Sequence, residues 1–117
     1  MDERILAYLY DVKKAIVELE SFFDGYPMRY DVFVKDALRR CAVERKTEIM
    51  GEAINRVLKI HPSFPLPNAK AVIDTRNRII HAYDSVKPEF LWGLVIRHIP
   101  ELKRDVERIL AEYIGEY

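Results

Sequence analysis

Cysteine, glutamine and long apolar runs are what this chain has least of. Its 117 residues include one cysteine, Cys41, and no glutamine. A lone cysteine excludes an internal disulfide and is typical of a reducing compartment. Its neighbours in "ALRRCAVE" favour a small core residue over a reactive thiol. The lack of glutamine is typical of heat-adapted proteins and says nothing about activity.

The charge is balanced, with 19 basic and 19 acidic residues. A net charge of zero disfavours generic wrapping of nucleic acid by a basic surface, and it leaves room for a local basic patch. No apolar run approaches the roughly 20 residues that span a bilayer, and the first residues lack the features of a signal peptide. We therefore expect a cytoplasmic protein that has no membrane partner. The length predicts one domain over residues 1–117.

Apolar residues recur at steps of three and four along nearly the whole chain, which predicts helices. The first stripe comprises Ile5, Leu9, Val12, Ile16, Leu19 and Phe23. A second long helix is expected over about residues 31–60, with Val34, Leu38, Cys41, Ile49, Ala53, Val57 and Ile60 facing inward. Its middle, "ERKTE", is polar all round and suggests a kink or an exposed bridge there.

In the second half of the chain, prolines mark the expected connections and helix starts. Three prolines in the segment 61–67 predict an extended connection, after which Asn68 is a suitable N-cap for a third helix. Pro88 suits the first turn of a fourth helix, and Pro100 restarts or kinks the last one. Nothing in the sequence has the alternation of a strand. The predicted fold is all-α, a small antiparallel helical bundle of about four to six helices.

The stretch "TRNRIIHAYD" at residues 75–84 concentrates polar chemistry on the third helix. The residues three and four positions from Arg76 are all apolar: Val72, Ile73, Ile79 and Ile80. Because burying an unpaired charge costs several kcal/mol, Arg76 must snorkel, meet a carboxylate, or face a cavity or interface that holds an anion. Tyr83 lies seven residues on and shares this stripe if the helix continues.

His81 lies on a different face of that helix, together with Asn77 and Arg78. Positions five residues apart differ by about 140° around an ideal helix, so one straight helix cannot aim Arg76 and His81 at one atom. The helix could end or distort near His81, or two copies of the chain could bring their motifs together across a symmetric interface. A structural ion pair and a functional site both remain open as interpretations of Arg76.

Other chemistry is poorly supported. The three histidines, His61, His81 and His98, are too far apart for a local ligand pair, and no Glu-x-x-His occurs. We therefore expect no metal and no cofactor. The acidic row at positions 44, 48 and 52 reads as a solvated face, in which Glu52 can pair with Arg56.

The segment "RNRIIHAY" resembles the Arg-x4-His-x-Tyr motif of the HepT-like branch of HEPN domains. Upstream, "EIMGEAINRVL" is similar to the family's helix with a Gly-Glu-Ala core. Downstream, "VKPEFLWGLVIRHIPEL" resembles the helix that follows the motif. The resemblance extends over essentially the whole chain.

This resemblance implies a helical two-fold homodimer with both motifs in a cleft at the interface. Family members are toxin partners of minimal nucleotidyltransferases in prokaryotic toxin–antitoxin pairs, and active members are metal-independent endoribonucleases. Carried over by position, Arg76 and His81 are the catalytic pair and Asn77 helps to position them. Tyr83 matches the tyrosine that the nucleotidyltransferase antitoxin modifies with AMP.

RNA cleavage without a metal needs proton transfer and positive charge beside the phosphate. An imidazole such as that of His81 suits the first task near neutral pH, and a guanidinium such as that of Arg76 suits the second. Arg78 could add phosphate attraction or be ordinary solvated surface. Two other hypotheses remain open: a non-catalytic helical adaptor that binds a nucleotidyltransferase and nucleotide or RNA, and a dimerisation module whose Arg76 pairs with a carboxylate.

Overall fold

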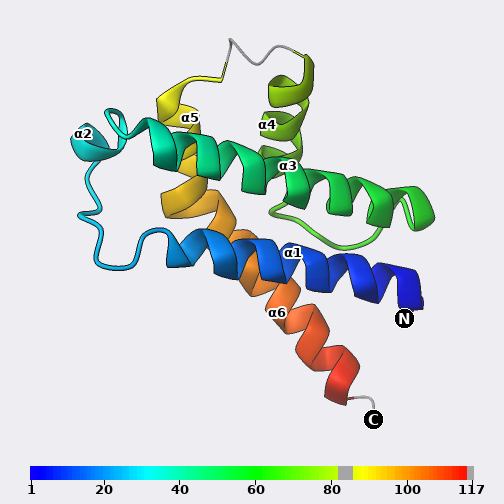
Figure 1. The fold of residues 1–117 in the computed structure, drawn as a ribbon. Helices are drawn as coiled ribbons and strands as arrows, with labels where there is room; N and C mark the ends of the chain where they lie inside the picture. Colours follow the sequence, from blue (N-terminus) through cyan, green and yellow to red (C-terminus); the bar gives the residue numbers. More distant parts are fainter. Residues whose placement is uncertain (82–85, 116–117) are drawn as a thin grey trace.

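The computed structural model describes residues 1–81 and 86–115, and within these ranges the chain is all-α, as predicted (Figure 1). The helices are α1 (Glu3–Ser21), α2 (Tyr30–Phe33), α3 (Ala37–Ile60), α4 (Lys70–His81), α5 (Pro88–Gly93), the π-helical segment η2 (Leu94–His98) and α6 (Ile99–Gly115). Within the described ranges, no helix is long and apolar enough to cross a membrane.

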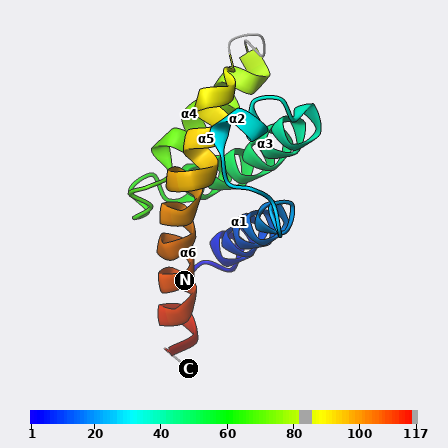
Figure 2. The ribbon, with the colours of Figure 1, turned by 90° about the vertical axis from the view of Figure 1, so that its left-hand side faces the viewer.

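Helices α1 and α3 lie side by side and run in opposite directions, and α4 and α6 both lie on one face of this pair, where α4 packs on α3 and α6 packs on α1 (Figures 1 and 2). The predicted stripe of α1 is confirmed, because its members from Ile5 to Leu19 are all buried. The Asp2 carboxylate caps the helix by accepting a hydrogen bond from the Arg4 amide at 2.7 Å. After α1 the chain turns at Gly25, whose φ of 68° favours glycine.

The prediction of one helix over residues 31–60 is wrong, because a break at residues 34–36 separates α2 from α3. Asp36 stabilises the break as the N-cap of α3, accepting hydrogen bonds from the Arg39 amide at 3.0 Å and from the Tyr26 hydroxyl at 3.0 Å. Both bonds favour the ionised carboxylate, and with the Arg39 guanidinium they lower the pKa of Asp36.

The break also corrects the expected inner face of this region. Leu38 is 79% exposed and Cys41 is exposed, so neither belongs to the core. The buried stripe of α3 begins only at Val43 and continues through Thr47 and Met50. Since Thr47 is fully buried and α3 is unbroken there, the expected kink or bridge at "ERKTE" is wrong as well.

In the second half of the chain, the helix predicted to begin near Pro88 is present, but the predicted role of Asn68 is wrong. Asn68 does not cap α4; its backbone amide and side-chain amide both donate to the buried carboxylate of Asp105, at 3.2 and 2.9 Å, which ties the connection to α6. Pro88 occupies the first turn of α5, as expected. The helical run continues through η2 into α6, and Pro100, which has no N–H to donate, is the second residue of α6.

Candidate functional site

The side chain of Arg76 lies where α4 crosses α3, and only 19% of it is exposed. The crossing is close because Gly51 is the α3 residue beneath it. A Cβ atom at position 51 would lie 2.6 Å from both Cβ and Cγ of Arg76, which real contacts essentially never show. The glycine therefore lets the stem of the arginine rest directly on the backbone of α3.

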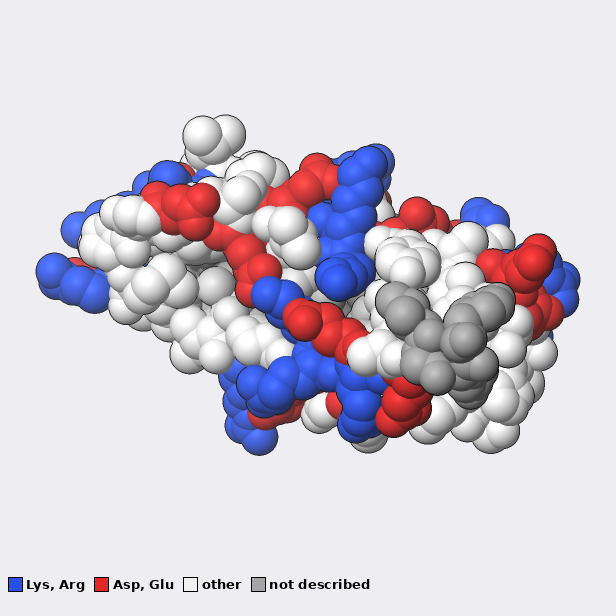
Figure 3. All heavy atoms as spheres, turned by 90° about the horizontal axis from the view of Figure 1, so that it is seen from below, with Lys and Arg blue, Asp and Glu red and all other residues white. Residues whose placement is uncertain are grey.

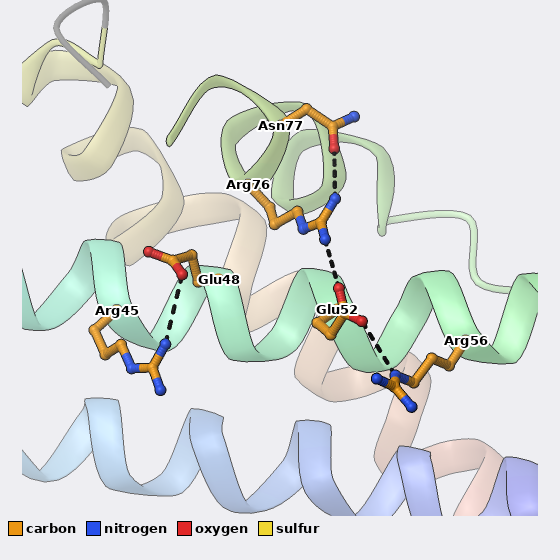
Figure 4. A network of polar contacts seen from close by, with 6 residues as sticks. All are labelled: Arg45, Glu48, Glu52, Arg56, Arg76 and Asn77. Carbon is orange, nitrogen blue, oxygen red and sulfur yellow. Dashed lines mark hydrogen bonds and ion pairs between the residues drawn. The ribbon is translucent and has the colours of Figure 1, made fainter. Parts of the chain in front are cut away.

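The guanidinium of Arg76 is held by two partners (Figure 4). Its Nη2 donates to Oε2 of Glu52 at 2.5 Å, and its Nη1 donates to Oδ1 of Asn77 at 3.1 Å. The other carboxylate oxygen of Glu52 accepts a bond from Arg56 Nε at 3.1 Å. The sequence allowed Arg76 to snorkel, to pair with a carboxylate or to face a bound anion. In the structure it pairs with a carboxylate of the same chain.

The carboxylate of Glu52 pairs with two arginines, Arg56 and Arg76, and its pKa is lowered as a result. The hydrogen bond from Arg56 and the charges of Arg76 and Arg56 lower the pKa of the Glu52 carboxyl, against a smaller opposing effect of partial burial. Glu52 is therefore ionised under ordinary conditions and keeps the guanidinium of Arg76 in place. One polar atom of the arginine has no partner among the described residues: its Nε is buried and makes no hydrogen bond.

A groove of about 610 Å³ runs between α1, α3 and α4, with Arg76 and Ile80 on its wall. Its other charged side chains carry both signs and come from α1 and α3: Asp11, Lys14, Glu18, Arg45, Lys46, Glu48, Glu52 and Arg56. Lys46 and Glu18 form an ion pair at 2.8 Å. The lower side of the molecule, where α1 and α6 lie, likewise carries acidic and basic side chains next to one another (Figure 3).

His81 is exposed at the end of α4 and does not line the groove that holds Arg76. The five-residue separation turns the two side chains about 140° apart on the helix. Asn77 is exposed except for its bond to Arg76, and Arg78 is exposed beside His81. Within one chain, the structure therefore joins Arg76 to Asn77 and leaves His81 apart from both.

Two residues near the motif were missed by the sequence reasoning. Glu52 was interpreted as part of a solvated row; its predicted pair with Arg56 is confirmed, but its bond to Arg76 was not foreseen. The preceding Gly51, which marks a close helix crossing, was the available signal. Phe90 was given no role from the sequence; it is 44% exposed and lies under the guanidinium of Arg78.

Tyr83, the expected AMP acceptor, lies outside the described residues. Within the described ranges, no three carboxylate, imidazole or thiol side chains come together in a way that could hold a metal ion.

Comparison with protein families shows the class of protein to which this helical chain belongs. The model of the "Ribonuclease HepT-like" family matches residues 12–109. The chain belongs to this family of HepT-like HEPN ribonucleases, and the predicted enzyme class, ribonuclease, is confirmed.

Two ribonuclease-like proteins are similar in sequence to this chain over most of its length and of their own. The protein named "Probable ribonuclease HepT" from Thermococcus cleftensis is 32% identical over 106 residues, which are 87% of this chain and 92% of that protein. A protein named "Putative RNase" from Methanocaldococcus jannaschii is 28% identical over 116 residues, covering 96% and 92% of the two chains. No solved structure matches the chain at a significant level.

Proposed function

We propose that this ribonuclease is the toxin of a prokaryotic toxin–antitoxin pair and a metal-independent endoribonuclease whose catalytic residues are Arg76 and His81. The observation that carries the proposal is the placement of the Arg76 guanidinium. Glu52 and Asn77 hold it from two sides, on the same helix as an exposed histidine, in a chain of the HepT-like family. A permanent planar cation held in this way is suited to phosphate oxygens.

The reaction uses the substrate's own 2′-hydroxyl as the nucleophile. A bond forms between the 2′-oxygen and phosphorus as the bond from phosphorus to the 5′-oxygen breaks. One group accepts the proton of the 2′-hydroxyl, and another donates a proton to the departing 5′-oxygen. His81 is the exposed imidazole of the motif and serves in proton transfer. Arg76 stabilises the negative charge that grows on the phosphate oxygens.

The geometry of α4 supports a site shared by two chains. Arg76 faces the groove and His81 faces away from it, so one chain does not aim both at one phosphate. In a two-fold homodimer, His81 of one copy can approach the same phosphate as Arg76 of the other. Two copies also supply two histidines, one as the base and one as the acid.

The proposed antitoxin is a minimal nucleotidyltransferase that attaches AMP to Tyr83. AMP on the phenol oxygen adds a bulky anion seven residues after Arg76, where it competes with the phosphate of the substrate.

The experiment is a cleavage assay on total tRNA and on mRNA in the presence of EDTA, comparing the wild type with His81→Ala. Because His81 is exposed at a helix end, the variant keeps its fold, and its circular dichroism spectrum matches that of the wild type. Cleavage by the wild type and none by the variant supports the proposal. Equal cleavage by both proteins contradicts the assignment of His81.

One observation favours a second candidate, a non-catalytic adaptor that binds a nucleotidyltransferase and RNA. The guanidinium of Arg76 already has a carboxylate partner, and a purely structural arginine would be held in the same way. An adaptor binds RNA and leaves it intact in the same assay.

A further inference from the structure

An exposed aromatic side chain lies beside the motif helix. Phe90, in the first turns of α5, leaves 44% of its surface in contact with water. The carbon at the centre of the Arg78 guanidinium lies over this ring, 5.1 Å from its centroid. The neighbouring Leu91 is buried and supplies the contact of this turn with the core. Phe90 is thus left at the surface, next to a cation.

Arg78 is available for a further partner. No carboxylate in residues 1–81 and 86–115 forms an ion pair with it, whereas the arginines at positions 4, 29, 39, 45, 56, 76, 97 and 108 each have one. Arg40, Arg104 and several lysines of the described residues form no ion pair with a carboxylate either, and Arg78 differs from them in lying over an aromatic ring. The guanidinium also retains donors that the ring does not engage.

His81 lies three residues after Arg78 on α4, so the two side chains are neighbours on one face of the helix. Both are exposed. The aromatic ring, the cation and the imidazole therefore form a continuous strip of surface that leads from Phe90 to the proposed catalytic residue.

We propose that Phe90 and Arg78 form a subsite for a nucleobase of single-stranded RNA and its phosphate, next to the scissile bond. This proposal rests on the proposed function, since it assigns the substrate a place beside His81. The base stacks on the open part of the Phe90 ring, and Arg78 donates to the adjoining phosphate. Unpaired bases stack in this way on aromatic rings and on guanidinium planes, without strong dependence on sequence.

The chemistry of the strip favours RNA over a protein partner. An apolar docking surface would present several aliphatic side chains together, whereas here a cation lies between one aromatic ring and an imidazole. Stacking on a planar ring together with a guanidinium is how single strands are held. The subsite therefore selects unpaired RNA over a duplex, whose bases cannot reach a ring at the surface.

The test measures binding separately from cleavage. The probe is a short fluorescein-labelled oligoadenylate with 2′-O-methyl riboses, which cannot be cut because the nucleophile is blocked. A matched oligomer of the same length carries abasic riboses. By fluorescence anisotropy, Phe90→Ala should weaken binding of the oligoadenylate roughly 5- to 100-fold and leave the abasic oligomer unchanged. Arg78→Ala should weaken both, since phosphate attraction does not depend on the base.

Two further variants separate stacking from folding. Phe90→Tyr keeps the ring and should bind the oligoadenylate as the wild type does. Phe90→Leu keeps apolar bulk and the fold but has no ring face, so it should lose affinity as Phe90→Ala does. Equal affinity of wild type and Phe90→Leu for the oligoadenylate overturns the subsite, as does an equal loss on both oligomers. Light scattering compares the molar mass of Phe90→Ala with that of the wild type. If the molar mass differs while both proteins bind the oligoadenylate equally well, Phe90 belongs to a protein interface and the proposal is overturned. Loss of this subsite with intact, His81-dependent tRNA cleavage leaves the proposed function standing.

Discussion

Arg76 and Glu52 are 24 positions apart in the sequence, and the guanidinium Nη2 of one lies 2.5 Å from the carboxylate Oε2 of the other. The pair joins α4 to α3 at the point where the two helices cross. Arg76 is largely covered while Glu52 remains 46% exposed, so the pair stands between a surface ion pair and a buried one. Its strength therefore decides how firmly the proposed phosphate-binding cation is positioned.

A double-mutant cycle with Glu52→Ala and Arg76→Ala measures this strength by chemical denaturation. We expect a coupling free energy of about 1 kcal/mol, because the exposed half of the pair is screened by water. Glu48→Ala and Arg45→Ala provide the matched control one turn away on α3, where the ions are 3.5 Å apart and the arginine is 69% exposed. That pair should couple by less than about 0.5 kcal/mol. Equal coupling in both cycles contradicts a special role for Glu52.

The pH dependence of the Glu52 contribution has a definite sign. The Arg56 hydrogen bond and the charges of Arg76 and Arg56 lower the folded-state pKa below the ordinary value of 4.5. A lowered pKa in the folded state means that the stabilisation is complete above pH 4.5 and is lost as the pH falls through the folded value.

Glu52→Gln removes this titration and keeps the shape of the side chain. The difference in unfolding free energy between the wild type and Glu52→Gln should be constant near neutral pH and shrink in acid. Urea titrations across this range measure the difference. If the gap widens in acid, the ion pair does not stabilise the fold as described.

Gly51 makes the close crossing possible, so Gly51→Ala should be destabilising. The new Cβ would lie 2.6 Å from two atoms of the Arg76 stem, which forces α4 away from α3. We expect a loss of about 1–3 kcal/mol, as in other overpacked sites. Gly93→Ala is the control, because a Cβ there meets nothing within 4 Å, and alanine should stabilise that helix by about 0.5–1 kcal/mol. Thermal melts of both variants test the contrast, and equal effects of the two substitutions would refute it.

Helical periodicity was sufficient to predict the all-α class and the inner face of α1, because each buried residue there follows from its neighbours three and four positions away. It misplaced Leu38 and Cys41, because the break at residues 34–36 resets the phase of the helix. The capping bonds of Asp36 stabilise that break, and one of them comes from Tyr26, ten residues earlier. A pattern of apolar residues within positions 31–60 contains no information about a hydrogen bond from Tyr26, which lies outside that range.

The candidate site was predicted in part for a similar reason. The isolated position of Arg76 on an apolar stripe was visible in the sequence, and the structure supplies the carboxylate that this position required. Which carboxylate it is depends on where α4 crosses α3, and local periodicity carries no information on that crossing. The stacking of Arg78 on Phe90 likewise joins two helices across the segment 82–87.

Arg76 should contribute to catalysis beyond its part in the fold. Arg76→Lys keeps the charge but has no planar fork, so it should retain partial stability while kcat falls by at least about tenfold, as a lost interaction with the transition state predicts. Arg76→Ala should show no measurable cleavage. Single-turnover kinetics on tRNA measure the effect, with Arg56→Lys as the control that keeps a cation beside Glu52. A kcat of Arg76→Lys equal to that of the wild type contradicts a role for the guanidinium in the reaction.

Control by an antitoxin predicts a defined change of mass. Co-expression with a cognate minimal nucleotidyltransferase should add AMP in whole units to Tyr83, which intact-protein and peptide mass spectrometry detect. Each unit adds a negative phosphodiester and an adenosine, so the modified protein should lose RNA cleavage through competition at Arg76. Tyr83→Phe keeps the ring without the acceptor oxygen; it should gain no mass and stay active beside the transferase. Silencing of Tyr83→Phe by the transferase would show that the partner acts through binding alone.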